Sequence, residues 1–465
     1  MHKRTKIITT VGPSTKSKES ILNLYKKGMN VVRINMSHAS HEDLKQIIGY
    51  VKSLNESLNQ SIGIMVDTQG PEIRTAKTSD SLELKKGQEL ILTQKKGKND
   101  RALPVDNLKY VKGIKKGGKI SLDNGAIELK IKKIDLSNNI ACEVLDSGVI
   151  AGKKHVNFPG AKIKLPTLTD KDKKDLDFAL EMGVDFIALS FCRSKQDLLT
   201  LKRFLKNRSE NVETFVKVED QEGLSNLDEI VKNSDGVMVA RGDLGIETDI
   251  TNLPYIQRKM IRVAAKHGKK SIVATQLLES MIKNPHPTRA EVSDVANAVY
   301  EGTDALMLSG ETSVGKYPVK CVEYMRDIAL NAERSETLQF QNGFKQETDW
   351  HTLAATTVKL SEKINADAIV VLTRSGFTAN LISRARPKVP VYAFTNSPST
   401  QNKLSLSSSV ENLSLKFTKN HEKTISAAFD VLKTKMKLKG KKKFVVISGI
   451  FSEIYADAIQ VKFMD

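Results

Sequence analysis

The sequence predicts an α/β protein built on a (β/α)8 barrel, and three observations lead to this fold class. Eight short apolar or β-branched runs recur within residues 6–308, and stretches of helical periodicity separate most of them. The spacing breaks once, between residues 71 and 166, and a new pattern begins after residue 335. We therefore expect a barrel with one inserted unit and one C-terminal unit.

The barrel strands are expected where the eight runs lie, at residues 6–11, 31–36, 62–66, 186–191, 214–218, 236–240, 271–274 and 305–308. Helices are expected between them, for example over residues 171–182 and 253–267. Most helical stretches end in a glycine, as at Gly28, Gly183, Gly268 and Gly302, and glycine is the commonest residue just past a helix end.

Residues 71–166 alternate strand-like runs with Lys-Gly and Gly-Gly steps, which predicts an inserted all-β lid domain. The barrel then comprises residues 1–70 and 167–335, close to the ~250 residues typical of this fold. Residues 336–465 predict an open α/β domain, with a helix at 350–363 and strands at 366–372, 389–394 and 444–448.

Composition restricts the class of protein. The chain has 465 residues, of which 40% are hydrophobic and 27% charged, as in globular proteins. No window offers the ~18 consecutive apolar residues of a membrane helix. Cys142, Cys192 and Cys321 form no metal-type spacing, and their odd number favours a reducing compartment. We expect a cytoplasmic protein.

The formal net charge of +19 raises the alternative of a non-enzymatic polyanion-binding protein. Most lysine pairs are scattered and lack interleaved aromatic residues, so nucleic acid is not the expected partner. Only residues 433–443, with seven lysines, resemble a basic patch. They follow a predicted helix, and a solvated helix face is favoured over a binding tail.

Charged side chains follow the predicted strands at the carboxyl ends, where barrel active sites lie. Arg33 and Asn35 share one face of the second predicted strand. Lys217 and Glu219 are likewise two residues apart, at the end of the fifth predicted strand, so they point to the same side. Glu219 with Asp243 makes a carboxylate pair suited to Mg²⁺ or Mn²⁺, while the cations suit phosphate. This set predicts phosphoryl transfer, and an internal salt-bridge network remains the structural alternative.

Two other motifs are rejected. Residues 310–316 spell Gly-x4-Gly-Lys, but Tyr317 and Pro318 follow where a phosphate-binding loop needs Ser or Thr and a helix. His38 and His41 have the spacing of one helical face, yet no third zinc ligand is evident.

Several long motifs in one order resemble the pyruvate kinase family. They lie at residues 32–38 (VRINMSH), 67–75 (DTQGPEIRT), 239–245 (VARGDLG), 274–282, 287–298 and 308–312. The resemblance extends from residue 5 to about residue 450. Gln69, Ala39 and His286 depart from residues common in the family, and none of them occupies a metal, phosphoryl or enolate role.

The resemblance implies transfer of phosphate from phosphoenolpyruvate to ADP, giving ATP and pyruvate. Lys217 would stabilise the phosphoryl group in flight, and Arg33 would reach both phosphoryl positions. Glu219 and Asp243 would bind Mg²⁺. The backbone at Ala240, Arg241 and Gly242 would bind the substrate carboxylate, and Thr275 would assist protonation of the enolate.

The resemblance also implies a K⁺ site, a nucleotide site and a quaternary state. Asn35, Ser37, Asp67 and Thr68 match the K⁺ ligands. Glu72 supports K⁺ dependence, because members that dispense with K⁺ carry a lysine there. Asn35, Met36, Ser37, His38, Arg74 and Lys154 match nucleotide contacts. The family resemblance further implies a homotetramer.

An effector site in the C-terminal unit is a weaker expectation. Thr373, Arg374, Ser375, Gly376 and Thr378 follow a strand and precede a helix, and they are similar to the family's sugar-phosphate loop. The tail at 448–465 lacks the glycine-rich loop associated with fructose 1,6-bisphosphate. A sugar monophosphate or AMP is therefore the expected activator, and an ordinary structural turn is the alternative.

Overall fold

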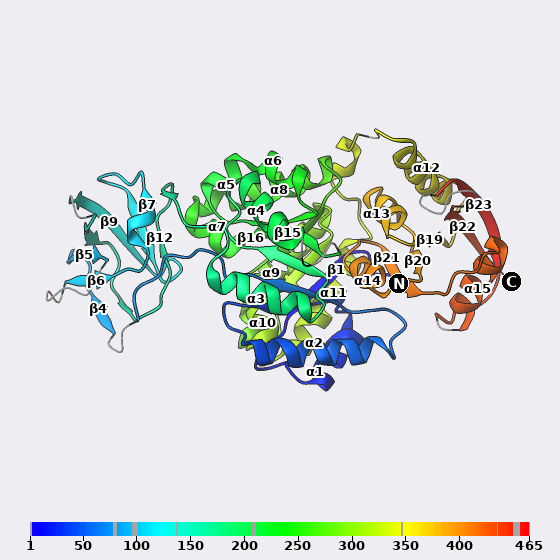
Figure 1. The fold of residues 1–465 in the computed structure, drawn as a ribbon, viewed down its shortest axis with the longest axis horizontal. Coiled ribbons are helices and arrows are strands. Elements are labelled where there is room, and N and C mark those ends of the chain that lie inside the picture. The colour runs from blue at the N-terminus through cyan, green and yellow to red at the C-terminus, as the bar shows by residue number, and fades with distance from the viewer. Residues whose placement is uncertain are drawn as a thin grey trace.

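A closed barrel of eight parallel strands forms the centre of the molecule in the computed structural model (Figure 1). The structure describes residues 2–77, 81–94, 101–135, 138–206, 208, 211–345, 347–434, 436–449 and 456–464. Part of the lysine-rich stretch, at residue 435, and part of the tail, at 450–455 and 465, lie outside the described residues.

The barrel strands closely match the predicted ones. They are β1 (Lys6–Thr10), β2 (Val31–Asn35), β3 (Gly63–Asp67), β14 (Phe186–Leu189), β15 (Glu213–Val218), β16 (Gly236–Ala240), β17 (Lys270–Ala274) and β18 (Ala305–Leu308). The barrel closes because β1 pairs in parallel with both β2 and β18. The predicted fold class is confirmed.

Alternating side chains divide the barrel strands between two cores. Ile8 and Met65 belong to the core inside the barrel, whereas Ile7 and Val66 pack under the surrounding helices. Those helices are α1 (Lys18–Lys27), α2 (His41–Asn55), α3 (Asp170–Glu181), α4 (Lys195–Lys206), α5 (Gln221–Ser225), α6 (Leu227–Asn233), α7 (Arg241–Glu247), α8 (Leu253–Lys266), α9 (Arg289–Tyr300), α10 (Gly310–Ser313) and α11 (Pro318–Ala332). Two 3-10 helices, η2 (Ile250–Asn252) and η3 (Glu279–Ile282), lie between them.

The inserted unit lies at one end of the molecule, and its described residues form strands and one 3-10 helix (Figure 1). Its main sheet has the order β12-β8-β9-β10-β5-β6, and two strand pairs, β11-β4 and β13-β7, complete it. The elements are β4 (Leu82–Leu84), β5 (Glu89–Thr93), β6 (Ala102–Pro104), η1 (Leu108–Tyr110), β7 (Val111–Lys112), β8 (Lys119–Leu122), β9 (Ile127–Ile134), β10 (Ile140–Val144), β11 (Gly148–Ile150), β12 (Val156–Asn157) and β13 (Lys162–Ile163). A separate apolar cluster forms its core.

The C-terminal unit lies at the other end and has a five-stranded sheet of order β21-β20-β19-β22-β23 (Figure 1). A 3-10 helix, η4 (Phe340–Gly343), precedes it and packs against α8 of the barrel. The elements of the C-terminal unit are α12 (Asp349–Lys363), β19 (Ala368–Leu372), α13 (Phe377–Arg384), β20 (Val391–Thr395), α14 (Pro398–Leu404), β21 (Val410–Ser414), α15 (His421–Thr434), β22 (Lys442–Ser448) and β23 (Ala458–Met464). The sequence did not predict β21 or β23, and β23 is antiparallel to β22.

The predicted boundaries at 70/71 and 166/167 fall between elements of different units, whereas η4, just after residue 335, packs against α8 of the barrel. The domain boundaries stay a prediction. The residues just after 335 also contact the barrel, because Leu338 donates its backbone N–H to the carbonyl of Tyr300 at 2.8 Å. No described helix is long and apolar enough to cross a membrane.

Candidate active site

A cavity of about 320 Å³ lies at the carboxyl ends of the barrel strands. Side chains from the ends of five of these strands line it, and so do Arg74, Asn124 and His155 of the inserted unit. The inserted unit therefore faces the mouth of the barrel, where a lid would have to be.

The ammonium of Lys217 occupies the centre of a buried polar cluster in this cavity. Its Nζ lies 3.1 Å from Oδ1 of Asp67 and 3.0 Å from Oε1 of Glu219, and it donates to Oγ of Ser190 at 2.9 Å. Burial disfavours the charge of Lys217, but the two carboxylates outweigh burial and raise its pKa above the ordinary lysine value. Lys217 is therefore a fixed positive charge at any physiological pH.

Arg33 provides a second fixed cation beside Lys217. Its Nε and Nη2 donate to the same oxygen of Asp67, at 2.9 and 2.6 Å, and its Nη1 donates to Thr10 at 2.9 Å. Burial alone would raise the pKa of Asp67, but Lys217 and Arg33 lower it overall. Asp67 consequently orients both cations.

Glu219 is a buried carboxylate whose pKa is raised by its surroundings. It accepts the backbone N–H of Phe191 at 2.6 Å, and Phe191 adopts a positive φ of 53°. Burial raises the pKa of Glu219 to about 8, and the nearby carboxylate of Asp243 adds to this effect while Lys217 opposes it. A buried carboxylate with a raised pKa and a second carboxylate beside it fit a divalent cation.

The donor set also fits the coordination habit of Mg²⁺. Within the described residues, no group of three or more His, Cys, Asp or Glu side chains has metal-binding geometry. Glu219 and Asp243 would thus be the carboxylate ligands, and the remaining positions would be left to water and substrate oxygens, which Mg²⁺ prefers.

Thr275 stands opposite this cluster in a strained backbone conformation. Its φ is 68°, which costs a β-branched residue ~1–3 kcal/mol. Its Oγ1 accepts the N–H of Gly242 at 2.8 Å and donates to the carbonyl of Ala274 at 2.6 Å. Arg241 holds the turn, because its buried guanidinium donates to the carbonyls of Thr275 and Gln276 at 2.7 and 2.8 Å. Strain of this kind clusters at functional sites.

The inserted unit contributes a second polar cluster to the cavity. Glu72 accepts from Nε of Arg74 at 2.6 Å and lies 3.5 Å from Nε2 of His155. Burial lowers the pKa of His155, and Arg74 lowers it further while Glu72 raises it. Lys154 instead pairs with Asp123 at 2.8 Å.

The structure brings most of the predicted site residues into one cavity. Those that line it are Arg33, Asn35, Ser37, His38, Thr68, Arg74, Lys217, Glu219, Ala240, Gly242, Asp243 and Thr275. The remaining predicted residues lie beside the cavity or apart from it. Asp67 lies beneath Arg33 and Lys217, the side chain of Met36 is buried, the side chain of Arg241 supports Thr275, and Lys154 is paired with Asp123.

The predicted effector residues lie far along the chain, where β19 leads into α13. Gly376 has a φ of 84° and precedes the first residue of α13. Its N–H donates to Oγ1 of Thr373 at 3.0 Å, and Thr400 donates to the carbonyl of Arg374 at 2.8 Å. The loop is therefore an ordered turn at a helix start.

Sequence reasoning missed Ser190, the hydroxyl closest to the Lys217 ammonium. Ser190 follows directly after β14, so the rule that identified residues at the other strand ends applies here too. It also missed Gln276 and His155, which line the cavity from loops, and Glu279, which lines it from the start of η3. Loop residues carry no strand periodicity, so no such signal was available for them.

The two rejected motifs have other structural roles. His41 contacts Asp175 at 2.8 Å and stacks on Phe178, whereas His38 lines the cavity. The Gly-x4-Gly-Lys stretch begins with the four-residue helix α10. The long helix α11 does start at Pro318, but Tyr317 and Pro318 stand where a phosphate-binding loop has Ser or Thr.

Comparisons with known proteins agree with the site. Residues 2–322 match the family model "Pyruvate kinase, barrel domain", and residues 351–461 match "Pyruvate kinase, alpha/beta domain". The chain is 41% identical over 414 residues to a pyruvate kinase of Staphylococcus saprophyticus, an alignment that covers 87% of this chain and 70% of that protein. It is also 41% identical over 413 residues to that of Staphylococcus aureus strain MRSA252, with the same coverage.

A solved structure supports the same relationship. The crystal structure of a pyruvate kinase from Cryptosporidium parvum superposes with a TM-score of 0.92 and 32% identity, covering 99% of this chain and 96% of that one. These findings do not support the alternative of a non-enzymatic polyanion-binding protein. The chain belongs to the pyruvate kinase family.

Proposed function

We propose that this chain transfers the phosphoryl group of phosphoenolpyruvate to ADP, giving ATP and pyruvate, with the residues of the barrel cavity. The observation that carries this assignment is the Lys217 ammonium, held 3.1 Å from Asp67 and 3.0 Å from Glu219 with Arg33 on the same carboxylate. Phosphoryl transfer requires mainly fixed positive charge and positioning, and this cluster provides both.

Lys217 and Arg33 act on the phosphoryl group itself. Both cations are held by Asp67, so their positions are set before substrate arrives and little reorganisation is needed as charge develops. Lys217 stabilises the group in flight between the two oxygens, and Arg33 contacts it on either side of the transfer.

Glu219 and Asp243 hold the divalent cation, Mg²⁺ or Mn²⁺. The cation supplies charge neutralisation for the phosphoryl and substrate oxygens when bound. Burial raises the pKa of Glu219 to about 8, and a cation held by Glu219 and Asp243 would favour the ionised carboxylate.

The carboxylate of phosphoenolpyruvate binds at the backbone of residues 240–242. Gly242 has no side chain to obstruct the approach, and α7 begins at this point. Thr275, held by the N–H of Gly242, lies beside the enolate and takes part in its protonation. Tautomerisation of the released enol then removes the product that would otherwise accept phosphate again.

K⁺ binds through the oxygen donors of Asn35, Ser37, Asp67 and Thr68. The hydrogen bond from the N–H of Ser37 to Oδ1 of Asn35, 3.2 Å long, already orders two of these donors. Glu72 occupies the position at which K⁺-independent relatives would carry a lysine, so the chain depends on the ion itself.

The nucleotide binds across residues 35–38 and the inserted unit. In the structure Arg74 contacts Glu72 and Lys154 contacts Asp123. To bind ADP, both cations would leave these carboxylates and contact the nucleotide. The inserted unit would close over the cavity and exclude water.

Three further expectations belong to the same proposal. The chain works in the cytoplasm as a homotetramer. A sugar monophosphate or AMP binds the ordered turn formed by Thr373, Arg374, Ser375, Gly376 and Thr378, which leads into the start of α13. Within this turn the N–H of Gly376 donates to Oγ1 of Thr373 at 3.0 Å and the N–H of Phe377 donates to Oγ of Ser375 at 3.4 Å.

The test measures pyruvate formation from phosphoenolpyruvate and ADP with Mg²⁺, in K⁺ and separately in Na⁺. We expect activity that requires K⁺ and disappears in Lys217→Met. Absence of activity in the wild-type protein, with ribose 5-phosphate, glucose 6-phosphate, AMP and fructose 1,6-bisphosphate each tried as activator, would contradict the proposal.

A further inference from the structure

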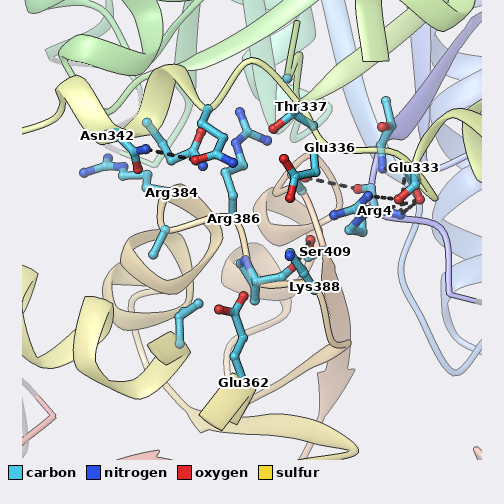
Figure 2. A pocket seen from close by; sticks show the side chains of 18 of the residues that line it. Arg4, Glu333, Glu336, Thr337, Asn342, Glu362, Arg384, Arg386, Lys388 and Ser409 are labelled. Carbon is cyan, nitrogen blue, oxygen red and sulfur yellow. Dashed lines mark hydrogen bonds and ion pairs between the residues drawn. The ribbon is translucent and has the colours of Figure 1, made fainter. Parts of the chain in front are cut away.

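A second cavity, of about 610 Å³, lies where the barrel meets the C-terminal unit (Figure 2). Its walls come from the N-terminal arm, the ends of α9 and α11, the segment 334–344 and one face each of α12 and α13. A volume of this size is typical of sites for small metabolites. None of its lining residues belongs to the catalytic cavity or to the turn at 373–378.

The walls of this cavity are strongly cationic. Six Arg or Lys side chains line it, against three glutamates. The cations are Arg4, Arg334, Lys359, Arg384, Arg386 and Lys388, and the acids are Glu333, Glu336 and Glu362. An anion is therefore the favoured occupant.

Two of these cations serve the fold. Arg4 contacts Glu333 at 3.7 Å, and Arg386 pairs with Asp304 at 2.9 Å. These ion pairs connect the barrel to the N-terminal arm and to the C-terminal unit. The charges of Arg4 and Arg386 are therefore compensated by carboxylates of the protein, and no ligand is needed for them.

The other cations lack such partners. Among the residues that the structure describes, no carboxylate lies within ion-pair distance of Lys359, Arg384 or Lys388. Arg384 is mostly buried against Gly268 and Phe344, and this burial lowers its pKa although the more distant carboxylates of Glu213, Asp304 and Asp235 act in the opposite direction. A buried guanidinium without a carboxylate is costly unless something else compensates for its charge.

Neutral polar groups of the cavity complement these charges. Figure 2 shows Arg384, Arg386 and Lys388 entering from the C-terminal unit, with Asn342 beside Arg384 and Ser409 beside Lys388. Amides and hydroxyls of this kind accept and donate hydrogen bonds to sugar hydroxyls. Guanidinium and ammonium groups are the usual protein partners of phosphate.

We propose that this cavity binds a small metabolite that carries phosphate, with Arg384 and Lys388 as its principal phosphate contacts. It is distinct from the turn at 373–378, because Arg384 ends α13 and the turn precedes its first residue. An eight-residue helix separates the two by about 12 Å. The site does not depend on the catalytic assignment.

The binding test titrates the full-length protein with inorganic pyrophosphate in metal-free buffer at fixed salt. Isothermal titration calorimetry measures affinity and stoichiometry. Trp350, the only tryptophan of the chain, lies in α12 next to the lining residue His351 and packs edge-on against Phe377 of the 373–378 turn, so its fluorescence responds to either site and is compared with that of Arg374→Gln. We expect both readouts to give one dissociation constant.

Charge-neutralising variants locate the binding. Lys388→Gln and Arg384→Gln should each raise the dissociation constant for pyrophosphate about tenfold or more, because a hydrogen bond from a charged group usually contributes that much to binding. Glu362→Gln removes a negative charge from the wall and should tighten binding. Lys363→Gln, on α12 but outside the cavity, should leave the affinity unchanged.

Arg384 also lies in the last turn of α13, where a cation favours the helix dipole, so its variant is checked for folding by circular dichroism. Lys388 is exposed and lies beyond the helix, so its variant tests the site without that risk. Lys217→Met and Arg374→Gln test the catalytic cavity and the 373–378 turn.

Several outcomes would overturn the proposal. They are no binding by the wild-type protein up to about 10 mM pyrophosphate, equal weakening by Lys363→Gln and Lys388→Gln, or loss in Lys217→Met or Arg374→Gln with none in Lys388→Gln. The first would show that the cavity has no phosphate affinity. The second would indicate non-specific attraction to the +19 chain, and the third would place the phosphate at another site.

Discussion

Replacing Lys217 by methionine removes the charge of the ammonium and keeps a chain of similar length. The Nζ is within 3.1 Å of two carboxylates and a serine hydroxyl, and only 12% of the Lys217 side chain is exposed. Loss of a single neutral donor to developing charge costs about 10²–10³ in kcat. A buried full charge contributes more, so we expect kcat to fall by at least about 10³-fold.

Stability should fall as well, because Asp67 and Glu219 lose a partner. Removal of one member of a buried ion pair costs ~3–5 kcal/mol. Asp67 keeps Arg33 and Glu219 keeps the N–H of Phe191, so we expect a loss near the lower limit.

Lys270→Met is a matched control for this experiment. Lys270 is also a barrel-strand lysine, with 13% of its side chain exposed against 12% for Lys217, and it pairs with Glu213 at 2.7 Å. It lies at the start of β17, on the opposite end of the barrel from the cavity. We expect lower stability with nearly unchanged kcat, because this end of a barrel serves stability.

The assay is a coupled measurement of pyruvate formation, with thermal unfolding of each variant to establish that it is folded. A folded Lys217→Met protein that keeps kcat within tenfold of the wild type would refute the catalytic role of the ammonium. Equal loss of kcat in both variants would attribute the effect to stability.

Three further outcomes are expected. Glu72→Lys should bring activity in Na⁺ close to that in K⁺, because its ammonium would replace the ion; a persistent K⁺ requirement in steady-state rates would contradict the assigned site. Thr275→Ala should lower kcat about 10²-fold or more with little change in KM, because a group that takes part in proton transfer is lost. An unchanged kcat would exclude a role of Thr275 in protonation. Burial opposes ionisation of Glu411, but Lys6 and His2 outweigh it and lower its pKa to about 2, so Glu411 stabilises the folded state above its unfolded pKa of about 4.5. Glu411→Gln should therefore have a lower free energy of unfolding than the wild type at neutral pH. In denaturant titrations this difference should shrink as pH falls from 4.5 toward 2. A difference that does not change with pH would show that the charge of Glu411 does not stabilise the fold.

The sequence alone determined the barrel, the insertion and the family motifs. Each barrel strand is short, apolar and followed by polar residues, and the observed strands agree with the predicted ones within a few residues because period and burial coincide there. The same pattern placed Arg33, Lys217 and Glu219 at one end of the barrel, since parallel strands share their carboxyl ends.

The sequence failed where local pattern carries no information. It missed β21 and β23, because β21 has little apolar periodicity and β23 alternates with lysine and glutamine along an edge. It could not show that Lys154 contacts Asp123, since these two residues are distant in the chain.

What the sequence determined by itself is which residue types stand at which strand ends, because that order follows from periodicity of two and from the handedness of βαβ units. Only the tertiary structure decided that Asp67 orients both Arg33 and Lys217, that Thr275 is held at a positive φ, and that unpaired cations gather between the barrel and the C-terminal unit. These features depend on distances between segments remote in sequence, and such distances are set by packing of the whole chain and by no local pattern.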